Sequence, residues 1–160
     1  MSEDIVLGTL PEPFGTVFEY RPTNRSGRLL FLAAQAAKTD SVTMLATGRC
    51  GGEVDFETAK RCAEGAADQA MAWIENSISK DEVLARVLRV TYYLAIDDDF
   101  DQLSEVADAG SRRFIAFYGD KGHHCRSVVG VSRLPRNTPV ALEVTVELAS
   151  ANEHNVALPD

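Results

Sequence analysis

In two stretches of this sequence a large apolar or aromatic residue stands at every second position, and these stretches constrain the fold more than any other feature. From Leu88 to Ile96, every second residue is a large apolar or aromatic one, and the same holds from Val140 to Leu148. A period of two is typical of a β-strand that buries one face. We therefore expect a sheet built around two long strands, the first running from Val83 to Ile96.

Two helical patterns are interleaved with these strands. The first follows Asp55, a residue type that caps helix N-termini, and runs to Ile78 with a mostly alanine stripe at a period of about 3.6 residues. Small side chains allow such a helix to approach a sheet closely. The second begins near Leu103, after the acidic Asp97–Asp99 that we expect to favour its N-terminus, and stops at Gly119.

The remaining segments are shorter. The apolar run Arg28–Ala37 predicts a buried strand, and Val42–Thr47 predicts a second extended piece. Residues 118–125 are expected to form a loop, and a further strand is expected over Arg126–Arg133. Residues 1–27 contain several prolines and glycines and predict a winding segment with short strands.

The resulting order of elements is strands, helix, strand, helix, strands. It predicts an α+β fold of two layers, in which a mixed sheet carries both helices on one face. We expect one domain over residues 1–149 and a polar C-terminal tail over residues 150–160. The opposite face of the sheet still carries Val, Leu and Tyr residues, so we expect other subunits to bury it.

Charge and length exclude several classes of function. The 160 residues carry 16 basic and 24 acidic side chains, for a formal charge of −8, which repels nucleic-acid backbones and anionic lipid. No apolar run approaches the roughly 18 residues of a membrane span. The three cysteines show no CxxC spacing and the N-terminus resembles no signal peptide, so we expect free thiols and a cytoplasmic location.

Four segments, in this order, resemble the RidA/YjgF family, the imine/enamine deaminases also called endoribonuclease L-PSP. Leu10–Pro13 is similar to its N-terminal proline segment, Leu29–Gln35 to its first long strand, and Asp99-Phe100 to the DF after its central strand. The most specific match is Gly122–Glu143, where the spacing of RS, V, LP, V and E follows the family pattern. The chain length is similar to a longer branch of the family, whose members are described as possible endoribonucleases.

This resemblance implies a chorismate-mutase-like fold of the trimeric type and a homotrimer with ligand clefts between adjacent subunits. In deaminating members an arginine clamps the carboxylate of a small imino or enamino acid, and a glutamate positions the attacking water. Arg126 matches that arginine, and a guanidinium binds a carboxylate through two parallel hydrogen bonds. The alternative for Arg126 is a salt bridge to a neighbouring glutamate.

The sequence also departs from the family pattern. Ala141 stands where deaminating members have a glutamate, and Glu143 is displaced from that place by two residues, about 6.7 Å along a strand. These changes predict a drier pocket and leave hydrolysis in question. We expect Arg126 and Glu143 to be catalytic, and we expect the substrate to be bound by Arg126 together with Phe18, Ala33, Gln35, Ala107, His124, Cys125, Ser127, Val128 and Ala141.

Other residues give weaker indications. Side chains of the adjacent His123 and His124 diverge on extended backbone, and Asp97–Asp99 is not followed by EF-hand spacing, so we expect no metal. Gly51-Gly52 matches no phosphate or dinucleotide loop, so we expect no cofactor. His124 or Cys125 as the missing acid or base, against a plain packing role, stays open.

Three functions follow. The first is a RidA-like homotrimeric enzyme, an imine/enamine hydrolase (deaminase) or a divergent relative, acting on a small carboxylate-bearing molecule. The alternative is a non-catalytic carboxylate-binding or regulatory trimer. A ribonuclease is disfavoured by the acidic charge, and neither nucleic acid nor a membrane is expected as a partner.

Overall fold

A computed structural model describes residues 8–152 of the chain. Its elements are β1 (Thr23–Ser26), β2 (Leu29–Ala36), α1 (Phe56–Ser77), β3 (Glu82–Ala95), α2 (Leu103–Tyr118), β4 (Cys125–Val131) and β5 (Val140–Ser150), with short 3₁₀ turns η1 (Gly119–Gly122) and η2 (Pro135–Asn137).

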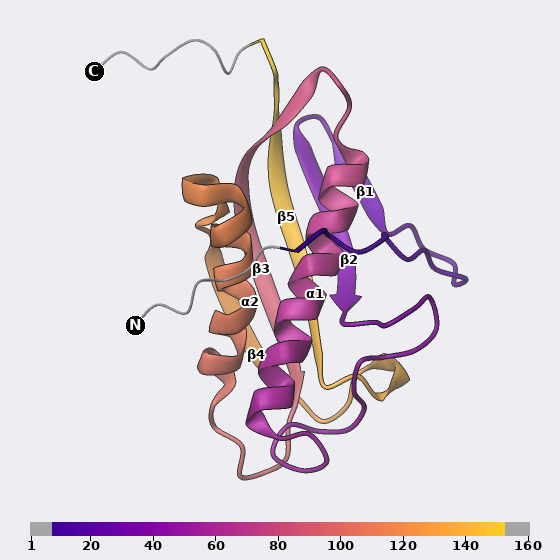
Figure 1. Ribbon diagram of the computed structural model, residues 1–160, viewed down its shortest axis with the longest axis vertical. Coiled ribbons are helices and arrows are strands. Elements are labelled where there is room, and N and C mark those ends of the chain that lie inside the picture. Colours follow the sequence, from indigo (N-terminus) through magenta and orange to yellow (C-terminus); the bar gives the residue numbers. More distant parts are fainter. Residues whose placement is uncertain (1–7, 153–160) are drawn as a thin grey trace.

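The five strands form one mixed sheet in the order β1-β2-β5-β3-β4. Strands β3 and β4 are parallel, and the other neighbours are antiparallel. Both helices cover the same face of this sheet (Figure 1). The predicted two-layer α+β architecture is therefore confirmed.

The alternating patterns become the two central strands. On the helix side, apolar residues of β3 and β5 are almost completely buried, among them Val90, Tyr92, Leu94, Leu142 and Val144. They belong to one hydrophobic cluster with the alanine stripe of α1, which includes Ala59, Ala63 and Ala67. The core thus lies between the sheet and the two helices.

Helix ends follow the sequence in part. The Asp55 carboxylate accepts a hydrogen bond from the Thr58 amide (2.7 Å) and caps α1, as predicted. Gly119, with φ +61°, ends α2, also as predicted. The prediction for Asp97–Asp99 was wrong, because the capping residue of α2 is Gln102 and Asp97 instead forms an ion pair with Arg49 (3.2 Å).

The expected extended piece over Val42–Thr47 is also wrong. This region forms a loop with a single bridge between Lys38 and Met44. The Asp40 carboxylate accepts hydrogen bonds from the amides of Val42 and Thr43, both at 2.8 Å, and this turn competes with strand pairing.

Strand β4 ends at Val131, two residues before the predicted end, and β5 continues to Ser150. Most of the predicted tail, residues 153–160, lies outside the described residues. Neither of the described helices has the length and hydropathy needed to cross a membrane.

We call the sheet face opposite the helices the outer face. Its apolar side chains Leu29, Phe31 and Val129 are 36%, 43% and 40% exposed. Polar residues lie between them, with Arg89, Thr91 and Tyr93 on β3, Ser127 on β4, and Glu143 and Thr145 on β5. Polar and exposed apolar groups therefore share one surface that neither helix covers.

Candidate functional site

A cavity of about 270 Å³ opens on the outer face. Three strands contribute to its lining, which consists of Phe31, Leu32, Arg89, Thr91, Glu143, Val144 and Thr145. Cross-strand pairing brings these residues together: Thr145 pairs with Phe31 on one side and Arg89 on the other, and Glu143 pairs with Thr91. We call this cavity the outer pocket.

Arg89 supplies the positive charge of the outer pocket. Its guanidinium donates a hydrogen bond to the Ser127 hydroxyl (2.7 Å) and lies 3.9 Å from the Cys125 sulfur. Within residues 8–152 it forms no ion pair with a carboxylate. An exposed guanidinium held by a neutral hydroxyl keeps its charge available for an anionic ligand.

Glu143 supplies the carboxylate. The Tyr93 hydroxyl donates a hydrogen bond to it (2.9 Å), and this bond raises the pKa of Tyr93 above its usual value. Tyr93 pairs across the sheet with Ala141, the position where the family pattern has a glutamate. The carboxylate of the outer pocket is thus that of Glu143, and a tyrosine on the neighbouring strand orients it.

This arrangement allows a definite chemistry. The lining combines an arginine, a glutamate and two threonines with the apolar side chain of Phe31. The guanidinium can bind a carboxylate through two hydrogen bonds, and the glutamate can accept a proton from water. The outer pocket can therefore hold a small organic acid beside a general base.

Arg126 has different surroundings. It pairs with Val90, so its side chain lies on the helix side of β4. There it donates a hydrogen bond to the Asp108 carboxylate (2.7 Å) and another to the Ser111 hydroxyl (3.2 Å). The salt bridge considered as the alternative is therefore present, with an aspartate of α2 as its partner. Arg126 and Glu143 lie on opposite faces of the sheet.

Ser111 links Arg126 to a small polar network. Its hydroxyl lies 3.1 Å from His124 Nε2 and 3.4 Å from the Tyr92 hydroxyl, and His124 Nδ1 lies 2.7 Å from the Gly122 carbonyl oxygen. A neutral His124 with its proton on Nδ1 satisfies both contacts. Burial of the imidazole, with the positive charge of Arg126 nearby, lowers the pKa of His124 and favours this neutral form.

The other predicted substrate residues do not gather in one place. Ser127 and Cys125 lie beside Arg89, and Ala141 lies beside Tyr93, all on the outer face. Val128 and Ala107 pack into the core, and buried Gln35 donates its amide hydrogen to the carbonyl of Ala33 (3.0 Å). Phe18 is 61% exposed, with the Arg136 guanidinium 5.8 Å from its ring.

The remaining candidates for site chemistry are metal-binding side chains and the three cysteines. Over the described part of the chain, no group of three or more His, Cys, Asp or Glu side chains is arranged to hold a metal ion. Cys50 and Cys62 are buried, which raises the pKa of each thiol to about 11 and keeps both neutral at physiological pH. Cys125 is the exposed cysteine.

Arg89 is the site residue that sequence reasoning missed. Its position in the alternating strand predicts an outward side chain, and so does that of Thr91. The sequence does not reveal that Glu143 lies across from Thr91, because this depends on the antiparallel register of β3 and β5. An arginine on the uncovered face of a long strand is the signal that could have drawn attention to it.

Comparison with known proteins identifies the fold class. No family model matches the chain. Protein TCP17 of Trypanosoma cruzi is 27% identical over 124 residues, which cover 77% of each protein. The crystal structure of Atu1372 from Agrobacterium tumefaciens, a protein of unknown function, is 28% identical with a TM-score of 0.79 and covers 89% of this chain and 87% of its own.

Two further structures are less similar in sequence, at 18% identity each. One, from Shewanella oneidensis, is provisionally described as an endoribonuclease; it has a TM-score of 0.80 and covers 87% of this chain and 91% of its own. The other is the YjgF gene product of E. coli, with a TM-score of 0.57 and coverage of 87% and 94%. This protein thus has the chorismate-mutase-like α+β fold of the RidA/YjgF structures, and the resemblance inferred from its sequence is confirmed in its fold.

Proposed function

We propose that this protein is a RidA-type small-molecule enzyme that hydrolyses an imine or enamine of a small carboxylic acid in the outer pocket. One observation carries the proposal: Arg89, a guanidinium without a carboxylate partner in the described chain, and the Glu143 carboxylate line one cavity. The clamp role that the resemblance gives to Arg126 passes to Arg89, because Arg126 is engaged by Asp108.

The reaction follows from these two groups. Arg89 binds the substrate carboxylate and holds the adjacent C=N carbon near Glu143. Glu143 takes a proton from a water molecule, whose oxygen attacks that carbon, and passes this proton to the nitrogen to give a neutral carbinolamine. It then moves the remaining hydroxyl proton to the nitrogen as the C–N bond breaks, which releases ammonia and leaves a keto acid. An enamine substrate first tautomerises to the imine, by gaining a proton on carbon and losing one from nitrogen. Water is consumed and no redox step is needed. Tyr93 holds the carboxylate of Glu143 in place through its 2.9 Å hydrogen bond.

A homotrimer in the cytoplasm is part of the proposal. The outer pocket opens on an uncovered sheet face that exposes Leu29, Phe31 and Val129. A site that open to water gives a carboxylate little protection from solvent, so a neighbouring copy packed on the outer face would strengthen the interaction with Arg89. Free cysteines suit a reducing compartment.

The test measures ammonia release from imino acids generated in situ by an amino-acid oxidase. We expect Glu143→Gln to lower the rate about 100-fold or more, since general base catalysis contributes about 10² to 10⁴. Arg89→Gln should weaken substrate binding about 10- to 100-fold. The matched control is Arg86→Gln, which removes a positive charge from the same strand outside the pocket lining. Equal rates in E143Q and the unsubstituted protein would refute the proposal.

A non-catalytic carboxylate-binding protein is the second candidate. Ala141 in place of the family glutamate favours it, since a methyl group neither orients water nor transfers a proton. Calorimetry with benzoate separates the two. Both candidates predict that R89Q loses binding, but only the enzyme releases ammonia faster than buffer does and requires Glu143 for it.

A further inference from the structure

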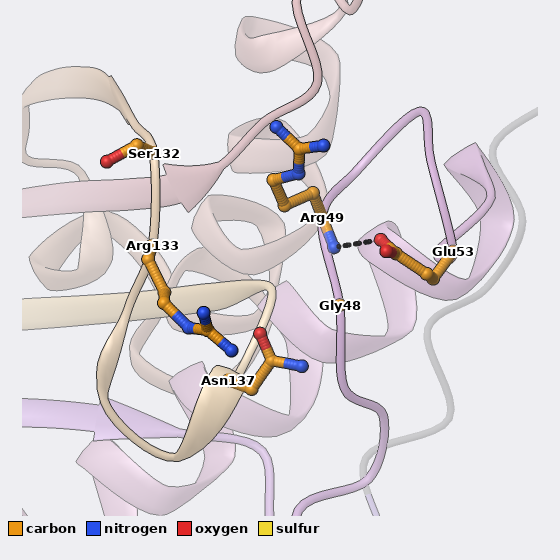
Figure 2. A pocket seen from close by; sticks show the side chains of 6 residues that line it. All are labelled: Gly48, Arg49, Glu53, Ser132, Arg133 and Asn137. Atoms are coloured by element: carbon orange, nitrogen blue, oxygen red, sulfur yellow. Dashed lines mark hydrogen bonds between the residues drawn. The ribbon is translucent and has the colours of Figure 1, made fainter.

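A second cavity, of about 330 Å³, lies away from the outer pocket and shares no lining residue with it. It lies between the loop before α1 and the turn that joins β4 to β5, and its lining consists of Gly48, Arg49, Glu53, Ser132, Arg133 and Asn137 (Figure 2). We call it the loop pocket.

Backbone contacts fix the two walls of the loop pocket. The Gly48 amide donates a hydrogen bond to the Asn137 carbonyl (2.8 Å), which ties one loop to the other. Gly48 has φ +118°, and a Cβ there would lie 2.6 Å from the Cβ of Glu53. Arg136 and Asn137 both have positive φ, at 55° and 56°. Consecutive non-glycine residues in this region are strained, and such strain concentrates at binding sites.

The charged groups of the loop pocket face it from opposite walls. Figure 2 shows Arg133 extended towards the side chain of Asn137, and Glu53 directed at the backbone of Arg49 from the other side. One Glu53 oxygen accepts the Arg49 amide hydrogen (2.9 Å). Arg133 and Glu53 form no ion pair with each other, and within residues 8–152 the Arg133 side chain has no hydrogen-bond or ion-pair partner.

The positive charge of Arg49 is paired with a carboxylate. Its guanidinium points away from Arg133 and forms an ion pair with Asp97 (3.2 Å). The loop pocket therefore presents one guanidinium without an ion-pair partner in the described chain, that of Arg133, and one carboxylate, that of Glu53, whose pKa is lowered by its hydrogen bonds from backbone amides and, to a lesser extent, by the nearby positive charges. A phosphate would be attracted by Arg133 but repelled by Glu53, whereas a molecule carrying both charges satisfies both walls.

We propose that the loop pocket binds a small α-amino acid. Its carboxylate is held by the Arg133 guanidinium and the Asn137 amide, and its ammonium group by the Glu53 carboxylate. At about 330 Å³, the cavity leaves room for a small side chain as well. This site is separate from the outer pocket and does not depend on the reaction proposed there.

Calorimetry at constant ionic strength tests this with three probes: L-alanine, propanoate, which lacks the ammonium group, and ethylamine, which lacks the carboxylate. We expect alanine to bind at least tenfold more tightly than either fragment. Arg133→Gln should weaken alanine and propanoate alike, by about 10- to 100-fold. Arg86→Gln, which lies outside both pockets, should change neither.

Glu53→Gln gives the sharper result, because a glutamine oxygen can still accept the Arg49 amide hydrogen and preserve the loop. We expect E53Q to weaken alanine about tenfold and to strengthen propanoate, since it removes a repelling carboxylate. A merely structural role for Glu53 would move both probes in the same direction. The proposal is overturned if propanoate binds as well as alanine, or if R133Q leaves alanine binding unchanged.

Discussion

Arg126 faces α2 from the edge strand β4, and Asp108 on that helix holds its guanidinium at 2.7 Å. The sequence pattern predicts that Arg126 lies at the beginning of a strand, and it is the second residue of β4. The pattern does not predict the partner, because Asp108 lies 18 residues earlier and meets Arg126 only when α2 packs on the sheet. A carboxylate of the same chain therefore engages the guanidinium that the resemblance assigned to a ligand.

A double-mutant cycle measures what this contact contributes. The Arg126 side chain is 24% exposed and that of Asp108 46%, so the pair lies between a surface and a buried salt bridge. We expect Asp108→Asn and Arg126→Met each to reduce the free energy of unfolding, with a coupling of about 1–2 kcal/mol. Urea denaturation of both single variants and the double variant gives this value.

The same Asp108→Asn variant decides between two roles for Arg126. If Arg126 were the carboxylate clamp, removal of its competing aspartate would tighten the binding of benzoate. We expect no tightening, because Arg89 on the outer face is the proposed clamp. Tighter benzoate binding in D108N, lost again when R126M is added, would restore the clamp to Arg126 and remove it from Arg89.

At the scale of elements, periodicity predicts the long helices and strands and fails for short segments. Helix α1 and strands β3 and β5 follow their patterns because each buries a continuous apolar stripe in one core. Val42–Thr47 has a similar composition but no strand beside it, and the Asp40 side chain holds its backbone in a turn. Local hydrogen bonds thus decide a segment that gains nothing from the sheet.

The close packing of α2 on β3 and α1 depends on Gly110. A Cβ at this position would lie 2.6 Å from the Tyr92 hydroxyl and 3.0 Å from the Ala63 carbonyl oxygen. Alanine is normally the better helix former by about 1 kcal/mol, but here its methyl group would overlap Tyr92 of β3 and press on α1, so that α2 would have to move away from both. We expect Gly110→Ala to lower the free energy of unfolding in urea by about 1–2 kcal/mol.

Exposed Ala116 on the same helix provides the control. Ala116→Gly should cost about 1 kcal/mol through helix propensity alone. If Gly110→Ala instead stabilised the protein by a similar amount, the close approach of α2 to Tyr92 and to α1 would be refuted.

At the scale of the molecule, the sequence predicts which residues face outward but not which of them meet. The outer pocket joins β2, β5 and β3, whose order in the sheet differs from their order in the chain. Glu143 could be chosen from its motif, whereas Arg89 becomes its neighbour only through the pairing of Thr91 with Glu143 and of Arg89 with Thr145. The pairing of residues between strands that are distant in the chain brings the site together, and no local pattern of a single sequence reveals this pairing.

The outer face gives the last prediction, because the proposed trimer must cover it. Val129→Asp places a charge on this face at a residue that does not line the outer pocket. We expect light scattering to give about three times 17.4 kDa for the unsubstituted protein and a monomer for V129D. V129D should also release ammonia more slowly, because the trimer is lost. The buried charge disrupts the interface between subunits, while every residue of the outer pocket stays in place.

Val42→Asp is the matched control, because Val42 is an exposed apolar residue, 69% accessible, on a loop rather than on the sheet. It should remain trimeric and active. A monomeric unsubstituted protein that still releases ammonia would show that the outer pocket works without a neighbour. A V129D monomer with full activity would lead to the same conclusion. The exposed apolar groups around Arg89 and Glu143 would then not be needed to complete the site.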